Sequence, residues 1–105
     1  MRIVNVVVNG RNLVVFDTNH AINYYRAFIE YCIDNYIQLR AYHDEFKRIV
    51  KTSADDPTFG RAIHYERINE YNNYFYSDWR SNQEKVRIMY RIANEIGIDL
   101  QVQVI

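Results

Sequence analysis

Two runs rich in β-branched apolar residues flank the pair Asn9-Gly10 at the start of the chain. Asn-Gly favours a two-residue type I′ turn, because that turn needs a positive φ at both central positions. We therefore predict a β-hairpin over residues 2–16, with Val8 facing Arg11 across the turn. The buried face is expected to carry Val4, Val6, Val8, Arg11, Leu13 and Val15. The opposite face is expected to carry Ile3, Asn5, Val7, Asn12, Val14 and Phe16.

From residue 18 to residue 51 the pattern changes to that of an amphipathic helix, with apolar residues at alternating spacings of three and four. The main stripe consists of Ile22, Tyr25, Ile29, Cys32, Tyr36, Leu39, His43, Phe46 and Val50. A second stripe beside it consists of Tyr24, Phe28, Tyr31, Tyr42 and Ile49. Asp17, Thr18 and Asn19 offer N-cap side chains. We predict one helix over 18–51, with more apolar surface than one neighbouring element can cover.

The segment 52–60 contains the only proline of the chain and is predicted to be a loop. Asp56 followed by Pro57 is a helix start, because proline is tolerated at the first helical position. We predict a second helix over 57–96. Its stripe consists of His64, Ile68, Tyr71, Phe75, Trp79, Asn82, Val86, Met89, Ala93 and Ile96.

Two local signals qualify this second helix. Ser81 and Glu84 have the spacing of a capping box, which marks a helix N-terminus. The sequence therefore leaves open whether the helix is continuous or breaks or kinks near residues 77–81. Gly97 stands where a helix-terminating glycine belongs.

The tail alternates strictly over residues 98–105, which predicts a half-buried strand with Ile98, Leu100, Val102 and Val104 on its inner face. The element order is then β-β-α-α-β within a single α+β domain, residues 1–105. The simplest assembly is a small antiparallel or mixed sheet, formed by the N-terminal hairpin and the C-terminal strand, with a long helical hairpin on one face.

The predicted lengths do not match each other. A helix of about 32 residues is roughly 48 Å long, whereas a strand of about seven residues is roughly 23 Å long. Either the helices break and fold back, or another chain covers the apolar overhang. We expect a homodimer, and the free sheet edges, including the terminal strand, offer a second route to self-association.

Composition narrows the class of protein. The chain has 105 residues, a formal net charge of zero and one cysteine, Cys32. Zero net charge disfavours a generic electrostatic grip on nucleic acid. No segment approaches the roughly 20 apolar residues of a membrane span, and the start does not have the pattern of a signal peptide. We therefore expect a cytoplasmic protein, in the host cytoplasm if its origin is viral, that does not act at a membrane.

The residues that could take part in catalysis or metal binding do not form a recognisable site in the sequence. His43 and His64 lie in the inner stripes without the helical spacing of a metal pair, and Cys32 lies in an apolar stripe where a thiol is inert. Glu30 and Asp34 follow Arg26 as a solvated charge ladder. No nucleophile, phosphate-loop or dinucleotide motif is present. We expect no enzymatic activity, no cofactor and no metal.

Arg and Tyr are abundant here and are enriched in protein interfaces. We expect a protein-binding module, of the kind by which small phage or mobile-element proteins inhibit a host protein or defence complex by surface docking. The candidate contact residues, all off the main stripes, are Tyr24, Tyr31, Tyr42, Tyr74, Tyr76 and Arg80. In the competing interpretation the second stripe of the first helix packs on the sheet, and only the helix ends are exposed.

A second function stays open. Arg80, Arg87 and Arg91 make the last part of the second predicted helix locally basic, and neighbouring aromatic residues could stack on bases. The alternative is therefore a homodimeric nucleic-acid-binding regulator.

Overall fold

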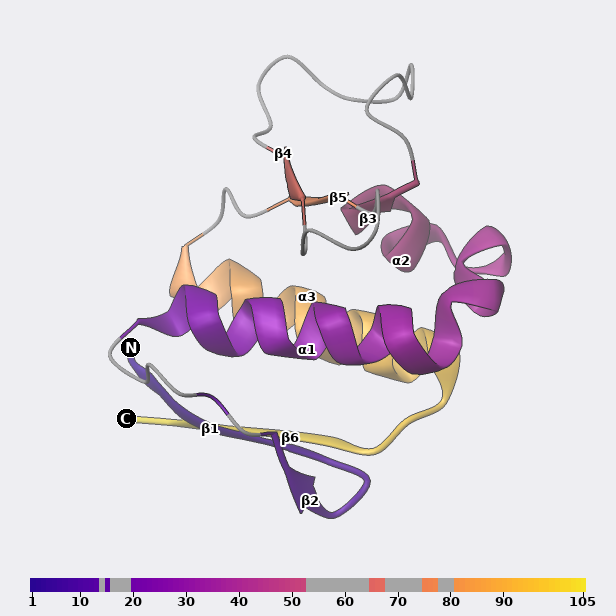
Figure 1. The fold of residues 1–105 in the computed structure, drawn as a ribbon. Helices are drawn as coiled ribbons and strands as arrows, with labels where there is room; N and C mark the ends of the chain where they lie inside the picture. Colours follow the sequence, from indigo (N-terminus) through magenta and orange to yellow (C-terminus); the bar gives the residue numbers. More distant parts are fainter. Residues whose placement is uncertain (14, 16–19, 53–64, 68–74, 78–80) are drawn as a thin grey trace.

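The computed structural model describes residues 1–13, 15, 20–52, 65–67, 75–77 and 81–105, and Figure 1 shows the arrangement of their helices and strands. In chain order the elements are β1 (Ile3–Val8), β2 (Arg11–Asn12), α1 (Ala21–Tyr36), the 3-10 helix η1 (Ile37–Tyr42), α2 (Asp44–Ile49), β3 (Val50–Lys51), β4 (Tyr65–Arg67), β5 (Phe75–Ser77), α3 (Asn82–Ile96) and β6 (Leu100–Val104). The predicted α+β class is confirmed.

The N-terminal hairpin turns where the sequence predicts. φ is 50° at Asn9 and 80° at Gly10, as a type I′ turn requires, and Val8 pairs with Arg11. The second strand is shorter than the hairpin predicted over 2–16, because β2 comprises only Arg11–Asn12.

The main sheet has the strand order β2-β1-β6 and is antiparallel. The strand predicted over 98–105 is confirmed as β6. Asn5 and Asn12 share the outer face as predicted, since the amide of Asn5 donates to the Asn12 side chain at 3.0 Å. Ile3 was predicted on that face but is buried in the core. A register shift between Ile3 and Asn5 is the cause, because a β-bulge inserts a residue and changes which side chains face inward.

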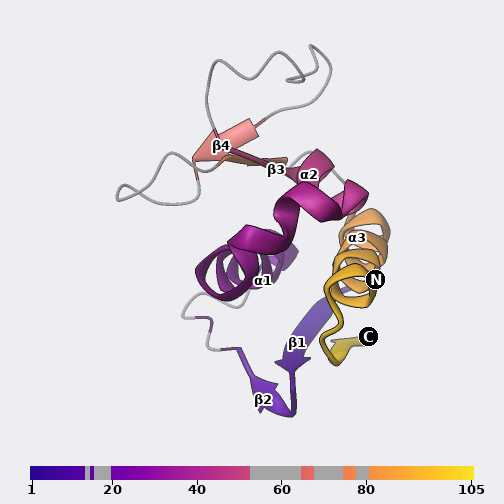
Figure 2. The ribbon, with the colours of Figure 1, turned by 90° about the vertical axis from the view of Figure 1, so that its right-hand side faces the viewer.

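Helices α1 and α3 cover one face of this sheet, as predicted, and they lie side by side (Figures 1 and 2). They run in the same direction in Figure 1, so they do not form the simple hairpin expected from the sequence. The core between helices and sheet consists of Ile3, Val6, Val8, Tyr24, Tyr25, Phe28, Ile29, Cys32, Ile33, Phe46, Ile49, Val50, Ile88, Met89, Ile92, Ala93, Ile96 and Leu100.

The continuous helix predicted over 18–51 is wrong beyond Tyr36. After α1 the chain continues as the 3-10 helix η1, and it leaves helical geometry at His43, where φ is −131° and ψ is 118°. It starts again as α2, which lets Phe46 and Ile49 turn into the core that α1 already occupies. The apolar spacing runs through the break without interruption, so periodicity alone could not reveal it.

The helix predicted over 57–96 is wrong at two places where the structure describes strands, β4 and β5. Helix α3 begins only after Ser81, whose hydroxyl accepts the Glu84 N–H at 3.1 Å. The break that the capping box left open near residues 77–81 is therefore a true helix start. At the other end Gly97 adopts the left-handed conformation, with φ of 80°, as predicted for a terminating glycine.

The observed helices fit the sheet that they cover. Helix α1 has 16 residues, or about 24 Å at roughly 1.5 Å per residue, and β1 has six residues, or about 20 Å. The chain has thus taken the option of breaking and folding back. The overhang, which was the first reason to expect a homodimer, does not occur among the described helices.

A second small sheet, of order β3-β5-β4 and antiparallel, lies on the side of the helices away from the main sheet (Figure 1). Helix α2 leads directly into β3 and packs against α3. No helix in the described part of the chain has both the length and the hydropathy needed to span a membrane.

Candidate functional site

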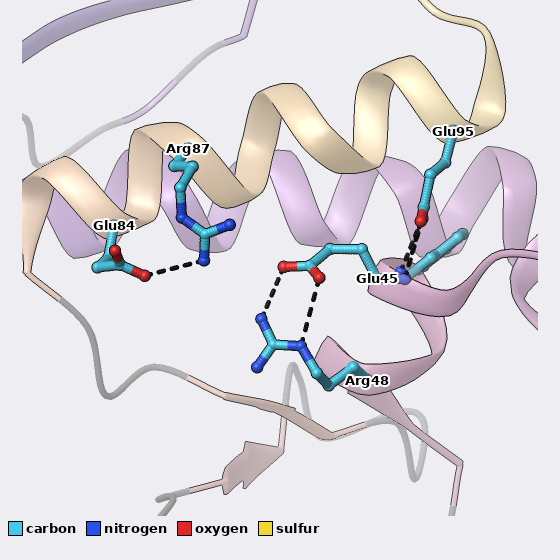
Figure 3. A network of polar contacts seen from close by, with 6 residues as sticks. Glu45, Arg48, Glu84, Arg87 and Glu95 are labelled. Atoms are coloured by element: carbon cyan, nitrogen blue, oxygen red, sulfur yellow. Dashed lines mark hydrogen bonds and ion pairs between the residues drawn. The ribbon is translucent and has the colours of Figure 1, made fainter.

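A cluster of charged side chains and backbone donors joins α2 to α3 (Figure 3). The carboxylate of Glu95, on α3, accepts the backbone N–H groups of Glu45, at 3.0 and 3.1 Å, and of Phe46, at 3.2 Å. These N–H groups belong to the first turn of α2, where backbone donors lack helical partners. Glu95 therefore acts as an N-cap supplied by a different helix.

Glu45 is only 6% exposed, and its side chain pairs with Arg48 one turn along α2. The Arg48 guanidinium donates to the two carboxylate oxygens at 2.7 and 3.3 Å. The hydrogen bond to Glu45 raises the pKa of Arg48 above its ordinary value. The pair holds the Arg48 guanidinium charged, and the Glu45 carboxylate accepts both of its hydrogen bonds.

The C-terminus of α2 is also held by a side chain, that of Arg40. The Arg40 guanidinium donates from Nε to the carbonyl of Val50, and from Nη2 to that of Lys47 at 3.5 Å. An anion at the N-terminus and a cation at the C-terminus both complement the helix dipole. The cluster thus explains how a helix of six residues is held in place, and we assign it a structural role.

The residues considered for catalysis or metal binding do not assemble in the described part of the chain. No group of three or more His, Cys, Asp or Glu side chains there is placed to hold a metal ion. Cys32 is fully buried, and burial raises the pKa of its thiol far above the ordinary value. His20 and His43 precede α1 and α2 without capping them through their side chains. His64 lies outside the described residues.

The tyrosines predicted as contacts have different environments. Tyr24 is 5% exposed, and its hydroxyl donates to the Val4 carbonyl at 3.0 Å, so its prediction as an exposed contact is wrong. The reason is that the second stripe of α1 packs on β1, as the competing interpretation held. Tyr31 is half-buried, and its ring lies 6.1 Å from that of Tyr36. Tyr42, in η1, is 80% exposed.

The other predicted contacts are less fully described. The backbone of Tyr76 pairs with Val50 and Glu66 in the second sheet. Tyr74 and Arg80 lie outside the described residues. The structure therefore does not bring the six predicted contacts together as one surface.

For the nucleic-acid alternative, Arg87 and Arg91 are both exposed on α3. The Arg87 guanidinium forms an ion pair with Glu84 at 3.0 Å, and this hydrogen bond raises its pKa. Arg80, the third arginine of that prediction, lies outside the described residues.

A shallow hollow of about 440 Å³ opens between the hairpin turn and α1. Its lining residues are Val8, Asn9, Arg11, Leu13, Tyr31 and Asn35. Burial, and then the neighbouring Tyr36, raise the pKa of Tyr31. The polar groups here are amides, a phenol and a guanidinium, so the hollow has hydrogen-bonding groups but no nucleophile.

The outer edge of β6 presents backbone hydrogen-bonding groups that no described strand pairs with. This strand is the last of the main sheet, and no described strand pairs with its outer side (Figure 2). The Val102 N–H on that side donates to the Tyr90 hydroxyl at 2.9 Å. Val104 is 42% exposed and Ile105 and Met1 still more so, and all three lie where the chain ends meet. We call Leu100–Val104 together with Tyr90 and Ile105 the β6 edge.

The predicted contact residues did not include any member of the β6 edge. The signal that could have found it is the uncharged alternation of Leu100–Val104 at the end of the chain, since natural edge strands are usually protected by charge, proline or a bulge. No protein-family model matches this chain, and comparisons with curated proteins and with solved structures found no match either.

Proposed function

We propose that this chain is a non-enzymatic protein-binding module that docks through the β6 edge. The observation that carries the proposal is an uncharged strand, Leu100–Val104, at the open side of the main sheet. An exposed strand edge binds an extended segment of another chain through main-chain hydrogen bonds, and the alternate side chains supply specificity.

The neighbouring side chains support this mode of binding. Val104, the last residue of β6, and Ile105, which follows it, are exposed aliphatic residues. A bound segment would remove their apolar surface from water. Gln101 and Gln103 are exposed on the outer face and add hydrogen-bonding groups. A module of this kind fits the inhibitor role expected from the sequence, in which a small phage or mobile-element protein occupies a surface of a host protein.

The proposal is tested with the whole chain as bait in host-cell lysate, compared with Val104→Lys and Tyr42→Lys. A charged residue on an edge strand opposes strand addition, whereas Tyr42 lies on η1, away from the β6 edge. We expect Val104→Lys to lose partners that the unchanged chain and Tyr42→Lys retain. Equal capture by all three would contradict docking at the β6 edge.

Nucleic-acid binding remains the alternative function. It is favoured by the exposure of Arg87 and Arg91 on one helix and disfavoured by the ion pair between Arg87 and Glu84. Retention on heparin that falls with salt and is weakened by Arg91→Gln would support it.

A further inference from the structure

The sequence of β6, Leu-Gln-Val-Gln-Val, has the same pattern of residue types in both directions about its central residue, Val102. Apolar residues stand at both ends and in the middle, and glutamines stand between them. The strand also has no charge that would repel an identical strand. These two properties suit pairing with a second copy of itself.

The pairing of β6 with β1 shows which backbone groups face outward. Asp99 accepts the Asn9 N–H, and Ile105 exchanges two hydrogen bonds with Arg2, so these odd-numbered residues face β1. In an antiparallel sheet the backbone groups of alternate residues face opposite sides. The N–H and C=O groups of Leu100, Val102 and Val104 therefore face outward, and the Val102 N–H, which donates to Tyr90, agrees with this.

We propose that the partner of the β6 edge is a second copy of this chain, paired antiparallel about a two-fold axis at Val102. Leu100 of one copy then lies opposite Val104 of the other, and Gln101 lies opposite Gln103. Every apolar residue meets an apolar residue, and every amide meets an amide. The two main sheets become one continuous sheet, with the helices of both copies on the same side. This inference rests on the proposed function: a second copy of the chain occupies the β6 edge when no host protein is docked there.

Tyr90 regulates this pairing. Its hydroxyl holds the Val102 N–H in the single copy, and the central hydrogen bonds of the pair need that same donor. Tyr90 is 41% exposed on α3, so its ring can move outward when the second strand arrives. Removal of the hydroxyl frees the strand edge without altering the strand. We expect Tyr90→Phe to tighten self-association by roughly tenfold, because two modest hydrogen bonds no longer need to be broken.

The test uses the purified chain of residues 1–105 and measures its solution mass by light scattering and sedimentation across micromolar concentrations. Gln101→Lys/Gln103→Lys and Gln101→Glu/Gln103→Glu place like charges opposite each other in the proposed pair. Both positions are exposed on the outer face, so circular dichroism should show both variants folded. We expect a dimer for the unchanged chain, monomers for each variant alone, and a dimer for the mixture of the two.

Register is tested by disulfide formation between Gln101→Cys and Gln103→Cys chains in a Cys32→Ala background. Opposed residues that do not exchange hydrogen bonds have Cα atoms about 4.5 Å apart, which a disulfide can span. We expect the mixture of the two chains to cross-link and neither chain alone to do so. Cross-linking of each chain alone to the same extent would overturn the proposed register.

A monomeric unchanged chain at all concentrations, also with Tyr90→Phe, would overturn the proposal of a second copy. That result would leave docking of a different protein intact, because partner capture and its loss in Val104→Lys are measured separately. A dimer that persists in both charged variants would place the self-association at another surface and would also overturn the proposal.

Discussion

The Glu95 carboxylate accepts the backbone N–H of Glu45 at 3.0 and 3.1 Å, across 50 residues of sequence. The contact ties the start of α2 to the last turn of α3. A carboxylate in this position satisfies backbone donors and also complements the positive end of the helix.

Glu95→Ala should destabilise the protein by about 1–2 kcal/mol, the usual cost of a lost cap with its charge. Glu95→Gln keeps an acceptor without the charge and should cost less. Chemical unfolding followed by circular dichroism measures both. Asn94→Ala is the matched control, because Asn94 is exposed on the same turn of α3 and should change stability by less than about 0.5 kcal/mol. Equal effects of Glu95→Ala and the control would contradict a capping role.

The elements that the sequence predicted best are those defined by local chemistry. The turn at Asn9-Gly10 and the start of α3 at Ser81 depend on backbone conformations and hydrogen bonds within a few residues. The predicted helix over 57–96 is wrong in part because aromatic residues at helical spacing also have a high preference for strands. Tyr65–Arg67 and Phe75–Ser77 pair with each other, a contact between segments that periodicity does not report.

In the candidate site, too, features set by local sequence were predictable and features set by tertiary packing were not. Tyr24 was expected to be exposed because it lies off the main stripe, but whether a stripe is covered depends on what packs against it. The sheet covers Tyr24, and the Val4 carbonyl accepts its hydroxyl hydrogen. Tyr90 and Val102 come together only when α3 lies beside β6, so the edge contact is tertiary, although the uncharged strand itself was visible in the sequence.

Tyr24 offers a direct test of this correction. Tyr24→Phe removes only the hydrogen bond to Val4 and should cost about 1 kcal/mol. Tyr24→Ser also removes the buried ring and should cost about 3–5 kcal/mol. The control is Tyr42→Ser, which should change stability by less than about 0.5 kcal/mol because Tyr42 is largely exposed. Thermal and urea unfolding provide the measurement. A small loss of stability in Tyr24→Ser would contradict the burial of Tyr24 and would support its prediction as an exposed residue.

Ser81 tests the start of α3. Its hydroxyl accepts the Glu84 N–H, so Ser81→Ala should destabilise the protein by about 1 kcal/mol, whereas Ser81→Asp should retain most of the stability. Gln83→Ala, at an exposed position in the first turn, serves as the control. If α3 were the end of a longer continuous helix, Ser81→Ala would instead be neutral or stabilising, because alanine is the better residue inside a helix.

Cys32 gives stability a predictable dependence on alkaline pH. Burial raises the pKa of its thiol in the folded chain, while the unfolded thiol titrates near its ordinary value of about 8.5. Above that pH the unfolded chain loses a proton that the folded chain keeps, so the free energy of unfolding falls as pH rises. The stability contributed by the neutral thiol is fully present below about pH 8 and decreases by roughly 2 kcal/mol by about pH 10.

The measurement is urea unfolding of the unchanged chain and of Cys32→Ala, under reducing conditions, at several pH values from neutral to alkaline. Other titrating groups, including Tyr31, are present in both chains and largely cancel in the difference. Cys32→Ala should therefore be the less stable chain at neutral pH, because it lacks buried volume. The difference in the free energy of unfolding between the two chains should become smaller as pH rises. A constant difference across the series would mean that the Cys32 thiol ionises as readily in the folded chain as in the unfolded one, which contradicts its burial in the core.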